Sequence, residues 1–296
     1  MPQVQFGWAV SVQGVKGSQN IPIAITQQAA ILPFVAQHFG SVWVYDHFFG
    51  IDRPSRPWLE GWTTLTWLAA RFPTLQVGTL VLSVGYRNPA LVAKMAATLQ
   101  TLSGGRLVLG IGAGWREEEY RAYGYPFPAA GVRRQQLEEA VEIIRRMWAE
   151  PAPSFQGAYF SIQEAFCEPR PDPPPTLMIG STGEKILPLV ARHADWWDSW
   201  FFSAESIESA TYRQKRDLLD HAAEAIGRDP AGITRSVSST GCVLPESAAD
   251  SARWVALLRP FVELGVTRFM FDFGHVPSTE PIARFAAEVI APLNQA

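Results

Sequence analysis

The sequence has few of the features that mark export, disulfide bonding, metal binding or nucleic-acid binding. Only two of its 296 residues are cysteines, Cys167 and Cys242, and no C-x-x-C motif occurs, so we expect neither a disulfide framework nor a zinc site. Acidic and basic residues nearly balance, at 28 and 25, and the sequence has no basic stripe. This argues against nucleic acid as a binding partner. No run approaches the roughly 18 apolar residues of a membrane span. The first twenty residues lack the pattern of a leader, so we expect a cytoplasmic protein acting on a small molecule.

Several common catalytic motifs are also missing. The metal-ligand patterns H-x-H and H-E-x-x-H do not occur, so the sequence predicts no metal site. The nucleophile elbow G-x-S-x-G of many hydrolases does not occur either. The stretch LVLGIGAGWREEEY, residues 107–120, has Trp115 where a dinucleotide fingerprint needs its third glycine. A site without metal ligands or a nucleophile suits a cofactor that brings its own reactivity.

Eight short runs of apolar and β-branched residues alternate with helical patterns, which predicts a parallel sheet. The runs are Val4–Val10, Ser41–Tyr45, Gln76–Leu82, Leu107–Ile111, Thr176–Ile179, Ala194–Trp197, Ser236–Val243 and Thr267–Phe271. An open doubly wound sheet and a closed (β/α)8 barrel both satisfy this pattern, and eight units in a chain of this length favour the barrel. We expect one α/β TIM-barrel domain over residues 1–296, with insertion segments at its C-terminal rim.

Two helices are clear from their periodicity. The first begins at Pro89 and ends at Gly104, with an apolar face at Leu91, Val92, Met95, Ala96 and Leu99. The second carries a face of Leu137, Val141, Ile144 and Trp148, with Glu142 and Arg146 paired opposite.

Two irregular segments complete the pattern. The stretch Phe155–Phe160 is typical of a small hairpin, which we place on the barrel rim, and the Pro-rich piece Cys167–Pro175 returns the chain to the next strand. The aromatic loop Phe48–Trp62 forms either a wall of the site or ordinary packing under a long loop.

Residues that follow the strands of a barrel lie at its C-terminal face, where such active sites form. Strand two leads into Asp46 and His47, and adjacent side chains point to opposite sides, so Asp46 is not expected to orient the imidazole. Because an imidazole titrates near neutrality, His47 is the best general acid or base, and a structural histidine is the alternative. The remaining histidines, His38, His193, His221 and His275, are assigned packing, capping or surface roles.

Two glycine-rich turns complete the candidate site. The segment Gly180-Ser181-Thr182-Gly183 offers backbone N–H groups, hydroxyls and a helix start, which together form an anion cradle or simply a helix N-cap. The glycines within residues 110–114 would let a flat ring approach the backbone. Trp115 is then either a wall of this cavity or a helix-face core residue. Glu117, Glu118 and Glu119 fall in the first turn of a helix, where the macrodipole favours acids, and we interpret them as structural.

Six segments, in order along the chain, resemble the luciferase-like monooxygenase superfamily, and in particular its branch that uses the deazaflavin coenzyme F420. They are Trp43–His47, Val77–Leu82, Arg87–Leu91, Leu109–Trp115, Phe155–Phe160, and Ile179–Gly183 continuing to Ala191–Asp195.

This resemblance implies a barrel that binds a flavin or deazaflavin at its C-terminal mouth. It implies a non-prolyl cis peptide at Leu80–Val81 against the ring, a phosphate at the Gly180–Gly183 turn, and His47 at the reacting edge. The cofactor-binding residues implied are Asp46, Leu80, Val81, Ser83, Gly112, Ala113, Gly114, Trp115, Gly180, Ser181, Thr182 and Gly183. Members of this family commonly pair as homodimers, so we expect a homodimer.

The sequence departs from the family at two places. Sugar-phosphate dehydrogenases of this branch carry a catalytic glutamate directly after the glycine turn, where this chain has Trp115, so that role does not transfer. Trp196-Trp197 replaces a more usual Gly-Trp.

From this resemblance, the first hypothesis is an F420-dependent oxidoreductase with an unidentified substrate. The alternatives are an FMN-dependent two-component monooxygenase and a non-catalytic cofactor-binding protein.

Overall fold

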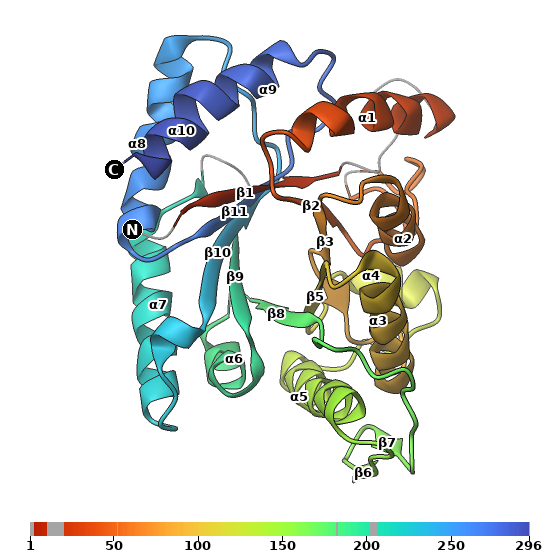
Figure 1. Cartoon of the computed structure of the whole chain (residues 1–296). Coiled ribbons are helices and arrows are strands. Elements are labelled where there is room, and N and C mark those ends of the chain that lie inside the picture. Colours follow the sequence, from red (N-terminus) through yellow and green to blue (C-terminus); the bar gives the residue numbers. More distant parts are fainter. Residues whose placement is uncertain (1–2, 11–20, 52, 182, 202–205, 296) are drawn as a thin grey trace.

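The computed structural model describes residues 3–10, 21–51, 53–181, 183–201 and 206–295. Within them, eight parallel strands form one closed sheet (Figure 1). The strands are β1 Gln5–Ala9, β2 Ser41–Val44, β3 Gln76–Thr79, β5 Leu107–Gly112, β8 Thr176–Gly180, β9 Trp196–Phe201, β10 Thr234–Ser239 and β11 Arg268–Phe271. They pair in the order β3-β2-β1-β11-β10-β9-β8-β5, and β3 pairs with β5 to close the barrel.

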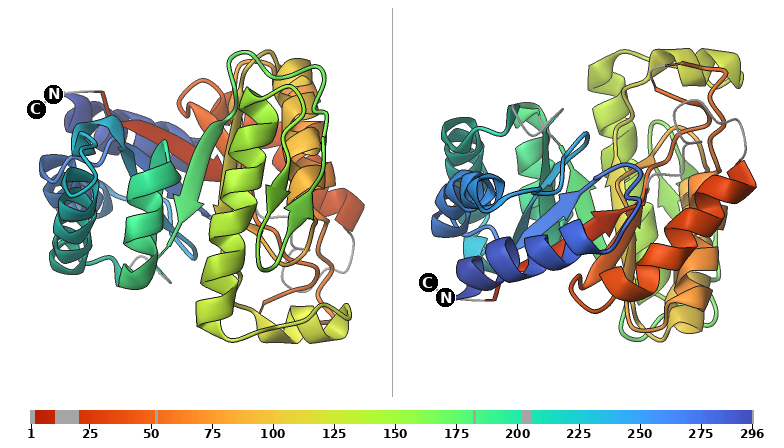
Figure 2. Two further views of the ribbon diagram at one scale, coloured as in Figure 1. Left: turned by 90° about the horizontal axis from the view of Figure 1, so that it is seen from below. Right: turned by 90° about the horizontal axis from the view of Figure 1, so that it is seen from above.

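Helices surround this barrel (Figures 1 and 2). They are α1 Ile21–Val35, α2 Gly61–Arg71, α3 Pro89–Ser103, α5 Ala130–Ala149, α6 Leu187–His193, α7 Ser209–Glu224, α8 Ala248–Glu263, α9 Glu280–Phe285 and α10 Ala291–Asn294, with a π-helical turn at Ala286–Ile290. Shorter elements are β4 Leu82–Ser83, α4 Glu117–Ala122, the 3-10 turns η1 Glu184–Ile186 and η3 Pro230–Gly232, and a hairpin of β6 Phe155–Gln156 and β7 Ser161–Ile162. The (β/α)8 fold class predicted from the sequence is confirmed. None of the helices in the described ranges is long and apolar enough to cross a bilayer.

Three of the predicted strands differ from the structure by more than one residue. The third run splits into β3 and β4 around residues 80 and 81. The sixth strand continues to Phe201, because Asp198 and Ser199 are buried within it and their polarity hides the strand from a hydrophobic pattern. The seventh ends at Ser239, before Gly241 adopts a positive φ of 65°.

The helix α3 has the expected ends and a rotated buried face. The Asn88 side chain accepts a hydrogen bond from the Ala90 N–H, and Gly104 closes the helix with φ of 68°. Leu91, predicted to be part of the apolar face, is 53% exposed, because the buried stripe is centred on Val92, Ala96 and Leu99. The predicted face of α5 is buried as expected, and its Glu142–Arg146 ion pair is present at 2.7 Å.

The hairpin β6-β7 forms as predicted but lies away from the mouth of the barrel. Its backbone N–H groups at residues 158, 159 and 160 all donate to the Glu139 carboxylate on α5. It therefore packs on the outer surface of α5, in the connection that leads into β8 (Figure 2). The insertions at the C-terminal rim are instead the loop that follows β2 and the segment of α4.

The barrel interior is filled in layers, because alternate residues of each strand point inward. The lower layer is apolar and contains Trp43, Val108, Met178, Trp196 and Met270. Two residues further along β2, β9 and β11 come Tyr45, Asp198 and Asp272, all buried. This second, polar layer is the floor of the functional site.

Candidate active site

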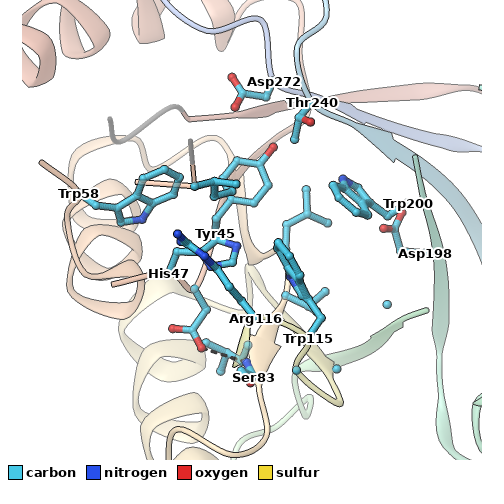
Figure 3. Close-up of a pocket in the computed structure, with 18 of the residues that line it drawn as sticks. Tyr45, His47, Trp58, Ser83, Trp115, Arg116, Asp198, Trp200, Thr240 and Asp272 are labelled. Atoms are coloured by element: carbon cyan, nitrogen blue, oxygen red, sulfur yellow. Dashed lines mark hydrogen bonds between the residues drawn. The ribbon is translucent and has the colours of Figure 1, made fainter. Parts of the chain in front are cut away.

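A cavity of about 790 Å³ opens at the C-terminal mouth of the barrel (Figure 3). Thr182, one of the predicted site residues, lies outside the described residues. All the others line the cavity: Asp46, His47, Leu80, Val81, Ser83, Gly112, Ala113, Gly114, Trp115, Gly180, Ser181 and Gly183. The volume lies in the range of small-molecule and cofactor sites.

The imidazole of His47 is oriented by a carboxylate from a distant segment. Its Nδ1 lies 2.8 Å from Oε2 of Glu119, whose side chain is fully buried. Glu119 also accepts hydrogen bonds from the Phe48 N–H, the Tyr86 hydroxyl and Arg116. Burial alone would raise the pKa of the Glu119 carboxyl, but these hydrogen bonds, chiefly that of His47, hold the pKa below its usual value. The interpretation of Glu119 as a helix-dipole residue was therefore incomplete.

This arrangement leaves one ring nitrogen of His47 for chemistry. With Nδ1 engaged by Glu119, Nε2 is the nitrogen that can exchange a proton with a bound molecule. The rings of Trp58 and Trp115 contact the imidazole edge to face, at centroid distances of 5.7 and 5.8 Å. The imidazole is thus held between two indoles, and its tautomer and orientation are set by a buried anion.

Asp46 serves a different partner, as the strand geometry predicted. Both of its carboxylate oxygens accept from Arg87, each at 2.9 Å, and one also accepts from the Ser83 N–H. Arg87 reaches on to Glu60, which caps the start of α2. Asp46 therefore clamps the end of β2 to the segment of β4 and does not orient His47.

The glycines of the site are required by packing within the protein. The Leu80–Val81 peptide bond is cis, in agreement with the family resemblance. A Cβ at either Gly112 or Gly180 would come within 2.8 Å of a Val81 methyl group. Gly114 has φ of 77°, and a Cβ there would lie 2.1 Å from the Tyr120 hydroxyl oxygen. Close packing around Val81 and Tyr120 is thus a reason for these glycines that the sequence does not reveal, and the approach of a ring to the backbone stays a prediction.

The predicted anion cradle is partly occupied by the protein itself. The Ser181 hydroxyl oxygen accepts from the Gly183 N–H at 3.1 Å, and the Ser181 N–H donates to the Asp198 carbonyl. The helix that follows, α6, has seven residues and begins after the turn η1. The Ser181 hydroxyl closes this turn but caps no helix, because Gly183 precedes η1, Ile186 precedes α6, and neither helix has a side-chain cap. The turn still faces the cavity.

The exposure and position of Trp115 and of the tryptophans in the loop after β2 show which of them are walls of the site and which are packing residues. Trp115 is 54% exposed and lines the cavity, so it is a wall of the site and not a core residue. Trp58 of the loop after β2 lines the cavity and also packs against the core, whereas Trp62 packs against the core without lining the cavity. His275, which the sequence assigned to a packing or surface role, lies on the lining at the mouth.

Two buried carboxylates in the floor, Asp198 and Asp272, are not among the residues predicted from the sequence. Asp198 accepts from the hydroxyls of Ser236 and Ser238 at 2.7 and 2.6 Å, and Asp272 accepts from the Gly274 N–H. Burial raises the pKa of each carboxyl to about 6, against the lowering effect of these hydrogen bonds. The indication in the sequence is a single acid within or directly after an apolar strand, but the sixth predicted strand ends at Trp197, four residues before the end of β9 at Phe201.

Comparison with known proteins places this geometry in context. The model of the luciferase-like monooxygenase family matches residues 37–287. An F420-dependent glucose-6-phosphate dehydrogenase of Kineococcus radiotolerans is 32% identical over 209 residues, which cover 68% of this chain and 59% of the relative. The chain thus spans about three fifths of the length of that relative.

Two solved structures share the fold over nearly the whole chain. An F420-dependent secondary alcohol dehydrogenase, in complex with an F420-acetone adduct, has a TM-score of 0.77 at 21% identity, covering 99% of this chain and 100% of that one. A monooxygenase from Streptomyces bottropensis has a TM-score of 0.78 at 17% identity, covering 97% of this chain and 99% of that one.

Proposed function

The chain belongs to the luciferase-like monooxygenase family, and we propose that it is an oxidoreductase that transfers a hydride between the deazaflavin coenzyme F420 and a small organic substrate. The observation that carries the proposal is His47, held by the buried Glu119 at the wall of the cavity. The choice of F420 over FMN is supported by the relative of Kineococcus radiotolerans, whose name specifies F420.

The residues of the cavity fit a planar tricyclic ring. Leu80 and Val81 form an apolar back wall beside Gly112, and Trp115 offers a half-exposed indole that a ring would cover. Ser83 and Ser181 offer hydroxyls at the lining for the polar parts of the coenzyme. When bound, a deazaflavin supplies a carbon centre that accepts or gives up a hydride.

The role of the protein in the reaction is to hold and transfer one proton. For oxidation of an alcohol, Nε2 of His47 would take the hydroxyl proton; for reduction of a carbonyl it would return it. Glu119, kept ionised by its hydrogen bonds, fixes the imidazole and stabilises the imidazolium that forms. The indoles of Trp58 and Trp115 restrict the access of water to this nitrogen.

The sugar-phosphate substrate of the relative is not part of this proposal. The family resemblance implies a catalytic glutamate directly after the glycine turn of such dehydrogenases, and this chain has Trp115 at that position. Two carboxylates, Asp198 and Asp272, lie in the cavity floor, where an anionic substrate would be repelled.

A binding titration tests the proposal. Purified protein is titrated separately with coenzyme F420 and with FMN, and fluorescence is followed. Saturable binding of F420 with little binding of FMN is expected, and binding of FMN alone would reject the proposal. Substrate-dependent oxygen uptake with reduced FMN would instead assign a two-component monooxygenase.

The role of His47 needs a separate measurement. A panel of secondary alcohols and ketones is screened for turnover of bound F420, and His47→Ala is compared with the parent protein. The variant should bind the coenzyme normally and lose turnover. If the parent protein itself binds F420 and turns over no compound of a broad panel, a non-catalytic binding protein is the better assignment.

A further inference from the structure

The floor of the cavity is a ring of hydrogen-bond acceptors built on three strands. Tyr45 follows β2, Asp198 lies within β9 and Asp272 follows β11, and all three line the cavity above the apolar layer of the barrel (Figure 3). Asp198 and Asp272 are 1% and 6% exposed. Neither carboxylate has an ion pair with a lysine or arginine among the described residues. A bound donor or cation would find two buried anions without a counter-charge.

The hydroxyl of Tyr45 is a second, independent sign that something binds here. Tyr45 is 94% buried, and its oxygen makes no hydrogen bond of ordinary geometry within the described residues. The Asp272 carboxylate lies near this oxygen and, after burial, contributes to raising the pKa of the hydroxyl. The hydroxyl points toward the side of the cavity that carries Thr240 and Asp272 (Figure 3). A buried hydroxyl without a partner is unfavourable, so a ligand group that pairs with it is bound more tightly.

The basic side chains that line the cavity lie away from its floor. The lining includes no lysine among the described residues, and its arginines are Arg56, in the loop after β2, and Arg116. Arg116 is 4% exposed, and its guanidinium is bonded to Glu119 and to the carbonyl oxygens of Phe49 and Gly50. The floor therefore keeps its negative character.

The walls above the floor are aromatic. Trp200 lies two residues beyond Asp198 on β9, so both side chains face the barrel interior, and Trp58 and Trp115 line the same cavity. Indole faces attract organic cations, and a pocket that combines carboxylates with several aromatic rings is suited to an ammonium group.

We propose that the floor of Tyr45, Asp198 and Asp272 recognises the protonated amine of a cationic substrate, with its carbon body against the tryptophan walls and its reacting carbon toward His47. This substrate class rests on the proposed function, because it assigns the organic partner of the hydride transfer. Burial raises the pKa of both carboxyls to about 6, so both are charged at slightly alkaline pH and gain from a cation beside them. A neutral alcohol would gain the hydrogen bonds and no charge pairing, and an anion would be excluded.

The test compares three probes with related skeletons: phenethylammonium, 2-phenylethanol and phenylacetate. Their binding to the full chain is measured by calorimetry at pH 8, first without coenzyme and then with F420 present. Phenethylammonium should bind at least about tenfold more tightly than 2-phenylethanol, and phenylacetate most weakly. Equal affinities, or a preference for phenylacetate, would overturn the inference.

Three variants locate the effect. Asp272→Asn and Asp198→Asn should each reduce the preference for phenethylammonium over 2-phenylethanol by about tenfold. Tyr45→Phe keeps the ring and removes only the hydroxyl, and it should weaken both donors. Asp217→Asn, which makes the same charge change on the exposed surface of α7, should change nothing. A preference that survives in both floor variants would refute the assignment.

These measurements separate the inference from the proposed function. Cation preference without coenzyme, together with failure to bind F420, would retain the cationic floor and reject the deazaflavin. Binding of F420 with no preference for the ammonium probe would retain the coenzyme and reject the substrate class. Circular dichroism of each variant confirms that a lost preference is not a lost fold.

Discussion

Replacing Asp198 by asparagine should make the protein more stable at alkaline pH while impairing its site. The carboxyl is 1% exposed and its pKa is raised from 3.8 to about 6, so ionisation in the folded state is unfavourable relative to the unfolded chain. A raised pKa of roughly 2 units corresponds to about 3 kcal/mol at 1.36 kcal/mol per unit. Asparagine has nearly the same shape and cannot ionise.

The sign of the pH dependence follows from linkage. Between pH 4 and pH 6 the folded state binds more protons at Asp198 than the unfolded state does, so the contribution of this group to stability falls as pH rises through that window. The cost is complete above the folded pKa. Asp198→Asn removes it, and loses part of about 1 kcal/mol for each of the hydrogen bonds from Ser236 and Ser238.

The assay is urea unfolding of both proteins at pH 4 and at pH 8, with Asp217→Asn as the exposed control. The free energy of unfolding of Asp198→Asn, relative to the parent, should rise by about 3 kcal/mol from pH 4 to pH 8. The control should give the same difference at both values. A difference for Asp198→Asn that does not change with pH would refute the reasoning, because it would mean that burial does not penalise the charge.

Three further predictions concern the other elements of the site. Glu119→Gln should lower turnover by about 10²–10³-fold and leave coenzyme affinity unchanged, because it removes the anion that orients His47; normal turnover would contradict this role. Gly112→Ala should destabilise the protein by about 1–3 kcal/mol in thermal or denaturant unfolding, since its Cβ meets Val81, and Val81→Ala in the same chain should recover much of the loss; no recovery would exclude that contact as the cause. Trp115→Ala should weaken F420 binding by about tenfold without lowering the melting temperature, because this indole is half exposed; an unchanged dissociation constant would remove Trp115 from the coenzyme site.

The fold and the glycine turns could be predicted because short segments of the sequence are enough to identify them. Alternation of apolar runs with helical periodicity identifies each β-α unit, and the carboxyl end of each strand in such a barrel lies at the mouth. His47 and Trp115 were found in this way. The rotated face of α3 shows the limit: Leu91 differs from Val92 by 100° around the helix, and their apolar character is the same.

The partners of the site residues could not be predicted, because they depend on three-dimensional contacts. Glu119 lies 72 residues from His47 along the chain, and no pattern in the sequence indicates that the two side chains are in contact. Asp198 is a single acid within β9 and Asp272 directly follows β11, and only the closed barrel brings them together with Tyr45. The position of the hairpin on α5 likewise follows from Glu139, which no local pattern identifies.

The central claim is that a deazaflavin lies against Leu80–Val81 with His47 beside its reacting carbon, and a crystal structure with bound coenzyme F420 tests it most directly. We expect density for the tricyclic ring between that peptide and the Trp115 indole, with Glu119 still bonded to Nδ1 of His47. Coenzyme density outside this cavity, or His47 turned away from the ring, would contradict the account.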